Sequence, residues 1–420
     1  MTYQHKKTQV NTMHRLAVFV AWACVFQMIE SLFPNPFPGL RLGLANMVTL
    51  VVLFQMGWGS ALEVAILRVL ISSLMFGTFL SPTFILSLSA SLTSTLMMGL
   101  LFHLSLRQDI LRFGLIGISM AGALTHILTQ LLLVYLLLVK HPGVFWLTPW
   151  LMLAALATGI ITGLLARQIC KDLDQSHVEL GRKEVMKLLA RSKIAPQKHQ
   201  EFSILSRINP ALKIMYVCFV ALLVLFFENL QLYSGILLFT LALVAVGKIS
   251  IQKVWLGVRK MGFFLLTLFL LQIVFTPQGS PLFQFVGIIV TSEGLRSGLL
   301  FVTRLLILLL NSNLVGLTTP PEELASHLSR LLSPFRIARF SPSRFSRILM
   351  MSWLLIPSFM DQAFTLVRTS TRHLHTLPHL ASSLSALILK TMHPPEDELR
   401  EEIVLAVEPE DNFIDMKKRQ

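Results

Sequence analysis

The chain has 420 residues, of which 54% are hydrophobic and only 14% are charged, and its formal net charge is +14. An ordinary soluble domain carries about a quarter charged residues, so this composition excludes a typical soluble enzyme and predicts a protein whose solvent is lipid. The positive charge does not indicate a nucleic-acid partner. Most lysines and arginines stand in short segments between apolar blocks, as in the cytoplasmic loops of membrane proteins.

The first half of the chain predicts six membrane-spanning helices, because several apolar blocks reach the length of about 20 residues that a bilayer requires. The predicted spans are residues 16–33, 43–59, 60–78, 81–103, 113–139 and 149–169. The first block lacks the features of a signal peptide, so we expect it to be a retained span. We therefore expect an all-α, polytopic integral membrane protein with a cytoplasmic N-terminus at 1–13 and a six-span domain at 14–169.

A polar, basic stretch separates the two halves, and residues 170–204 are the predicted cytoplasmic linker. A second helical domain follows at 205–392, and the acidic tail at 393–420 is predicted to be disordered. The spans expected in this second domain are residues 212–230, 233–247, 261–277 and 294–317, followed by an apolar segment at 348–367. Pro357 should kink that last segment. The proline- and arginine-rich stretch between 318 and 347 predicts a cytoplasmic amphipathic helix rather than a span.

Polar and ionisable side chains inside the predicted spans are the candidate functional residues, because a charge near the bilayer centre costs about 2.5 to 3.5 kcal/mol. In the first half these are Glu30, Arg41, Asn46, Glu63, Arg68, His126 and Gln130. His126 and Gln130 are four residues apart and share a helix face with Gly122. We expect Arg68, in mid-span, to face a cavity, and Glu63 and Arg68 to pair across helices rather than with each other. In the alternative interpretation, Arg41 and Glu63 snorkel to the interface and Glu30 pairs with an arginine only to hold helices together.

Small and hydroxylated residues mark places where helices should approach closely. Gly159 with Gly163, and Gly294 with Gly298, each form a GxxxG pair that permits such an approach. The run SLSASLTST at 87–95 is expected to pack against a neighbouring helix, although it would also suit a position beside a cavity.

Signatures of enzymes are absent from the sequence, which has no GxxxxGK[ST], GxSxG, HExxH or DDxxD pattern. The chain is therefore not expected to be an enzyme, and any ATP that it uses would be hydrolysed by a separate subunit. The three cysteines, Cys24, Cys170 and Cys218, stand alone and predict neither a disulfide framework nor a metal site.

The second half resembles the transmembrane coupling component of energy-coupling-factor transporters, the cobalt-transport Q-like family. The resemblance rests on INPALKIM, on EGLRSGLLFVTRLLILLLNSNLVGLTTPPEELASHLSRLLSPF and on LLIPSFMDQAFTLVRTS. In that family, paired cytoplasmic helices end in Ala-Arg-Gly motifs whose arginines dock into the ATPases. The nearest matches here are Arg368, which stands between Val367 and Thr369, and Arg372, which precedes His373. The resemblance implies that Arg368 and Arg372 contact the ATPases, although neither motif is intact.

The first half resembles the Gx transporter family, whose members are often labelled heptaprenyl diphosphate synthase component I. The matching stretches are GLRLGLANMVTL, VAILRVLISSLMFGTFLSPTFILSLSAS and GISMAGALTHILTQ. The resemblance implies a six-helix substrate-capture component. Its ligand site would be lined by Glu30, Arg41, Asn46, Arg68, His126 and Gln130.

Together these features lead to one hypothesis and two alternatives. The hypothesis is a fused substrate-capture and coupling subunit of an ATP-driven importer in the bacterial inner membrane. It would bind no cofactor itself, would work with cytoplasmic ATP-binding-cassette ATPases, and would carry a small molecule whose anionic or polar group suits Arg41 and Arg68. The alternatives are a membrane accessory subunit of prenyl diphosphate synthesis and a membrane scaffold of a quinone or redox complex.

Overall fold

The computed structural model of the chain describes its helical core and leaves several connecting segments aside. The described residues are 2–32, 43–76, 78–79, 81–107, 113–139, 142–175, 205, 208–275, 279–285, 288–319, 323, 327, 342–370, 386 and 388. Within these ranges, seven helices are long and apolar enough to cross a membrane. The prediction of an all-α, multi-pass membrane protein is thereby confirmed. The predicted cytoplasmic helix after residue 319 and the acidic tail lie almost entirely outside the described residues.

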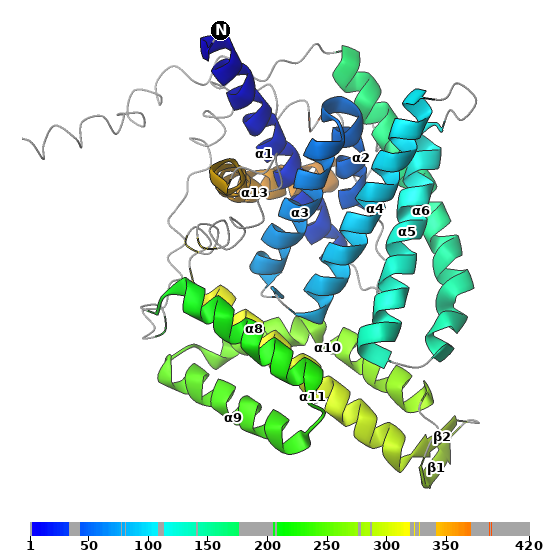
Figure 1. The fold of residues 1–420 in the computed structure, drawn as a ribbon, viewed down its shortest axis with the longest axis vertical. Helices are drawn as coiled ribbons and strands as arrows, with labels where there is room; N and C mark the ends of the chain where they lie inside the picture. Colours follow the sequence, from blue (N-terminus) through cyan, green and yellow to red (C-terminus); the bar gives the residue numbers. More distant parts are fainter. Residues whose placement is uncertain are drawn as a thin grey trace, which may run out of the picture.

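The first half is built from six α-helices, and Figure 1 shows α3 to α6 standing side by side. The helices are α1 (Thr2–Leu32), α2 (Leu44–Met56), α3 (Trp58–Phe76), α4 (Pro82–Arg107), α5 (Leu115–Leu133) and α6 (Thr148–Gln175). A π-helical turn (Val134–Val139) and a 3-10 turn (Pro142–Leu147) lie between α5 and α6. Helix α2 is shorter than the predicted span 43–59, because Gly57 takes a φ of 85° and ends the helix.

Helices α5 and α6 meet along two glycines. A Cβ atom placed on Gly159 would lie 2.9 Å from the Cα of Met120, and one placed on Gly163 would lie 2.8 Å from the Cα of Ile116. Both distances are too short for real carbon atoms. The predicted close approach at this GxxxG pair is therefore confirmed, and glycine is required at both positions because the facing backbone occupies the space.

The described residues of the second half form four helices, a short hairpin and a further long helix. The elements are α8 (Pro210–Phe226), α9 (Leu230–Val246), α10 (Ile251–Phe275), β1 (Pro281–Phe285), β2 (Ile288–Thr291), α11 (Ser292–Thr318) and α13 (Pro342–Ser370). Strands β1 and β2 pair antiparallel, and the sequence did not predict them. Helix α10 begins ten residues before the predicted span 261–277 because its basic first turns also favour a helix.

Polar side chains fix the starts of these helices and their contacts. The side chains of Asn209, Asn229 and Thr291 accept hydrogen bonds from backbone N–H groups in the first turns of α8, α9 and α11, which is how such residues cap helices. Between α9 and α11, the buried amide Nδ2 of Asn311 donates to the hydroxyl of Thr240 at 3.0 Å. Paired in this way, these polar groups are satisfied inside the membrane domain.

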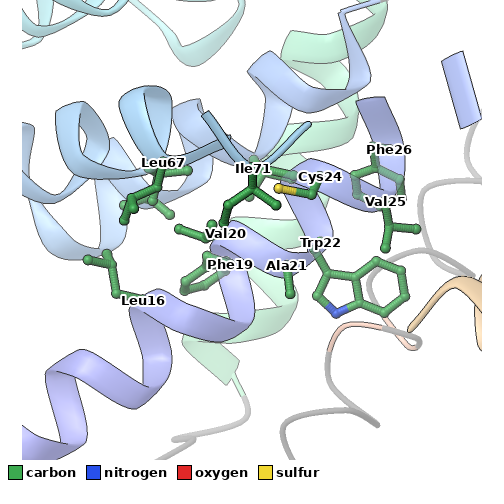
Figure 2. Close-up of a cluster of buried hydrophobic side chains, with 14 of the residues drawn as sticks. Leu16, Phe19, Val20, Ala21, Trp22, Cys24, Val25, Phe26, Leu67 and Ile71 are labelled. Atoms are coloured by element: carbon green, nitrogen blue, oxygen red, sulfur yellow. The ribbon is translucent and has the colours of Figure 1, made fainter. Parts of the chain in front are cut away.

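Helix α13 packs along α1 of the first half. The rings of Trp22 and Phe359 stack with centroids 4.8 Å apart, and the hydroxyl of Ser352 donates to the carbonyl oxygen of Ala17 at 3.1 Å. Figure 2 shows Trp22 pointing away from the α3 side chains Leu67 and Ile71, which pack on the opposite side of α1. The two halves therefore share one hydrophobic core rather than meeting only through the linker.

A buried ion pair also joins the halves. Arg344 Nη2 of α13 lies 3.0 Å from Glu63 Oε2 of α3, and the carboxylate side chain is only 8% exposed. The prediction that Glu63 pairs across helices is confirmed, and the alternative in which it snorkels to the interface is wrong.

We predict that Gly163→Ala lowers the thermal stability of the detergent-solubilised protein, because the new methyl group would press on the backbone at Ile116. Overpacking of this kind costs about 1 to 3 kcal/mol. The matched control is Gly117→Ala on α5, where a Cβ meets nothing within 4 Å. Equal melting temperatures for the two variants would contradict the described α5–α6 contact.

We predict that Glu63→Ala lowers stability by about 1 to 3 kcal/mol, because it leaves the Arg344 guanidinium without its carboxylate. The exchanged pair Glu63→Arg with Arg344→Glu should recover part of that loss. Glu293→Ala serves as the control, since its pair with Arg296 is exposed and such pairs contribute little. Thermal melting of the four proteins checks this, and a loss no larger than that of the control would refute it.

Candidate functional site

A pocket lies within the first half, and all six of its helices contribute to the wall. Its lining residues are Gln27, Glu30, Gly43, Ala45, Asn46, Arg68, Val69, Ser87, Ser94, Met98, Ser119, Gly122, Ala123, His126, Ile127, Ala155, Thr158 and Thr162. Polar side chains, glycines and alanines make up most of the lining, together with Val69, Met98 and Ile127. Pockets formed between the helices of a bundle are common sites for small molecules.

The structure brings four of the six predicted ligand-binding residues to this one pocket. Glu30, Asn46, Arg68 and His126 all line it. Gln130 is buried on the same helix as His126 but is not part of the lining. Arg41 lies outside the described residues. That these side chains bind a ligand remains a prediction.

Arg68 is held in place inside the bundle. Its side chain is only 4% exposed, and its Nη2 donates to Ser91 Oγ of α4 at 2.7 Å. The expectation that Arg68 faces a cavity is confirmed. A buried guanidinium carries a fixed positive charge and up to five N–H donors, so it can supply the pocket with a strong site for an anionic or carbonyl group.

Glu30 stands where α1 and α2 come together at the pocket. Its Oε1 accepts a hydrogen bond from the backbone N–H of Leu44, the first residue of α2. The N-terminus of a helix carries a partial positive charge and unsatisfied N–H groups, so this carboxylate both caps α2 and is stabilised by it.

Helix α4 presents a polar stripe that the sequence analysis underestimated. Ser87 and Ser94 line the pocket, and Ser91 between them holds Arg68. The spacing of three and four residues is the helical repeat, and it is the signal that would have found this face. The expected packing role is correct for Thr93, whose hydroxyl lies 2.8 Å from that of Thr129 on α5.

The predicted ATPase contacts cannot be placed with the same detail. Arg368 lies in the last turns of α13, and its side chain is not described. Arg372 lies outside the described residues. Their role therefore remains a prediction from the resemblance.

Two family models match the chain, one in each half. Residues 19–169 match the family described as heptaprenyl diphosphate synthase component I. Residues 201–390 match the family described as cobalt transport protein. Residues 170–200, which neither family model covers, lie within the predicted linker.

Curated relatives carry the name energy-coupling factor transporter transmembrane protein EcfT. The protein from Exiguobacterium sibiricum is 32% identical over 161 residues, which is 38% of this chain and 61% of the relative. Those from Limosilactobacillus fermentum and Bacillus subtilis are 25% and 26% identical over 167 and 160 residues, covering 40% and 38% of this chain and 62% and 60% of the relatives. The chain thus spans about three fifths of the length of these relatives.

These matches agree with the two resemblances deduced from the sequence. The chain is therefore a multi-pass membrane protein that joins, in one polypeptide, a first half similar to the heptaprenyl diphosphate synthase component I family and a second half similar to the cobalt transport protein family.

Proposed function

We propose that this chain is a fused substrate-capture and coupling subunit of an ATP-driven importer of the energy-coupling-factor type. The name of the curated relatives supports the coupling role. The pocket among α1 to α6 supports the capture role. The protein would lie in the bacterial inner membrane with its N-terminus in the cytoplasm, as the basic residues before the first span favour.

The observation that carries this proposal is the position of α13. One face of this helix packs on α1, whose Gln27 and Glu30 line the pocket. Its C-terminal turns contain Arg368, which the resemblance implicates in ATPase docking. A movement imposed on the arginine end of α13 would therefore reach the pocket-forming half through direct contacts, without passing through the linker.

The arrangement of the two halves favours a tilting motion. Figure 1 shows α8, α9 and α11 running crosswise to α3 to α6. Transmembrane helices are tilted on average by about 20° from the bilayer normal, so helices that cross in this way are expected to differ in their tilt within one membrane. We infer that the six-helix half is tipped over in this conformation and that ATP hydrolysis by partner subunits drives its return.

A membrane accessory subunit of prenyl diphosphate synthesis is the second candidate, and the description of the first-half family favours it. It would need a catalytic partner, since the sequence contains no DDxxD pair to bind metal and diphosphate. The transport proposal accounts for both halves of the chain, whereas the synthesis proposal gives the second half no role.

We predict that ATP-binding-cassette ATPases co-purify with the detergent-solubilised wild-type protein. They should be lost from a double variant Arg368→Glu, Arg372→Glu, because carboxylates would replace the two positive charges that the resemblance implicates in docking. Mass spectrometry of the affinity-purified proteins makes the comparison. Arg296→Glu is the control, since this arginine is exposed and lies near the start of α11, on a different helix from Arg368.

Retention of the same ATPases by the double variant would refute the assigned role of the two arginines. Recovery of a prenyl synthase subunit with no ATPase would instead replace the transport proposal by the synthesis proposal.

A further inference from the structure

The charges that line the pocket are few and opposed. Among the described lining residues, Glu30 is the one carboxylate and Arg68 the one guanidinium, and His126 is the remaining titratable side chain. Glu30 and Arg68 are each only 4% exposed. At short range in a poorly solvated site such charges act strongly. The pocket thus offers one guanidinium to a ligand with two or three negative charges, and it places a carboxyl group in the same lining.

Hydrogen-bonding groups extend over the whole length of the pocket. On α4 the lining runs from Ser87 to Met98, eleven residues or about 16 Å along a helix. Ser87 lies at one end, and the hydroxyls of Ser119 and Thr162, 2.9 Å apart, lie near the other. The apolar lining residues are fewer than the polar ones: three alanines, Val69, Met98 and Ile127.

One buried hydroxyl in the pocket wall is available to a ligand. Ser94 Oγ is buried at 1% side-chain exposure and has no hydrogen-bond partner in the described part of the chain. It lies beside Gly122 of α5, where an added Cβ would meet the Ser94 hydroxyl at 3.3 Å and the Met98 side chain at 2.7 Å. Gln27 and Asn46 add two carboxamides to the same pocket, each of which offers donors and an acceptor.

We propose that this pocket takes a water-soluble small molecule with at most one acidic group and with hydrogen-bonding groups along its length, and that it rejects prenyl diphosphates. The inference rests on the proposed function and specifies its substrate. A prenyl chain would leave Ser94, Gln27 and Asn46 desolvated without partners, and its diphosphate would face Glu30. Sites built to hydrogen-bond reject analogues that lack the matching groups by as much as about 10⁴-fold.

The test uses the full-length protein in detergent. Wild-type protein and two α4 variants are incubated with an aqueous extract of the host cells, washed, and analysed by native mass spectrometry for the compound that they retain. Ser94→Ala removes the unpartnered hydroxyl, and Leu96→Ala changes an exposed residue of the same helix. In parallel, the melting temperature is measured with farnesyl diphosphate at about 1 mM, enough to detect weak binding.

The expected results are specific. The wild-type and Leu96→Ala proteins retain the same water-soluble compound. The Ser94→Ala protein retains about tenfold less of it, in keeping with the loss of one hydrogen bond. Farnesyl diphosphate leaves the melting temperature of the wild type unchanged. Stabilisation by farnesyl diphosphate, or retention of no compound by the wild type, would overturn the proposal. Co-purifying ATPases together with a retained prenyl compound would overturn it while leaving the transport function in place. Retention of a water-soluble compound without co-purifying ATPases would support the assigned substrate class and contradict the transport function.

Discussion

The burial of α1 is the constraint on which the rest of the molecule depends. Every side chain from Leu16 to Phe26 is at most 2% exposed, so the helix is apolar on all faces and surrounded on all faces. Lipid tails are as apolar as these side chains, and hydrophobic transfer therefore does little to drive helix association in a membrane. Close packing and the occasional hydrogen bond, such as that from Ser352 to Ala17, must hold the neighbours in place.

That constraint joins the two halves mechanically. Helices α2 and α3 pack against α1, and α13 from the second half packs against it as well. Helix α3 contributes twice, because Glu63 pairs with Arg344 of α13 while Arg68 lines the pocket. Five residues of helix, about 7.5 Å, separate the contact between halves from the pocket wall. A shift of α13 against α3 is therefore felt close to the pocket.

Much of the fold was predictable because membrane-spanning helices are recognisable in a sequence from their length and apolar composition. The two glycines of α6 were read correctly, since only close packing explains their spacing. Arg68 and His126 were identified because a polar group in a span is costly enough to need a reason. Ser94, in the run at 87–95, was assigned to helix packing rather than to a cavity for the opposite reason. A serine in a membrane helix can bond to its own backbone at little cost, so its presence alone does not tell a pocket from a packed face.

The contacts between the halves were beyond the sequence. The sequence of an apolar helix such as α1 does not predict which helix will pack against it. Nothing in the sequence around Glu63 indicates a pair with Arg344, which lies 281 positions further along the chain. The same holds for the hairpin of β1 and β2, whose few residues lack a clear alternation. These features arise from tertiary packing, which overrides or exceeds local propensity.

Fusion changes what the contact between α13 and α1 has to achieve. Two separate membrane subunits must find each other and offset the entropy lost on association. A linker makes the same encounter intramolecular, with an effective concentration in the millimolar range for short flexible connections. The interface therefore does not need to be permanent in order to be occupied. Within the described residues, one stacked aromatic pair, one hydroxyl bond and one ion pair mark the docked position beside the shared hydrophobic core. Under the proposed function, ATPase subunits acting on α13 would displace it.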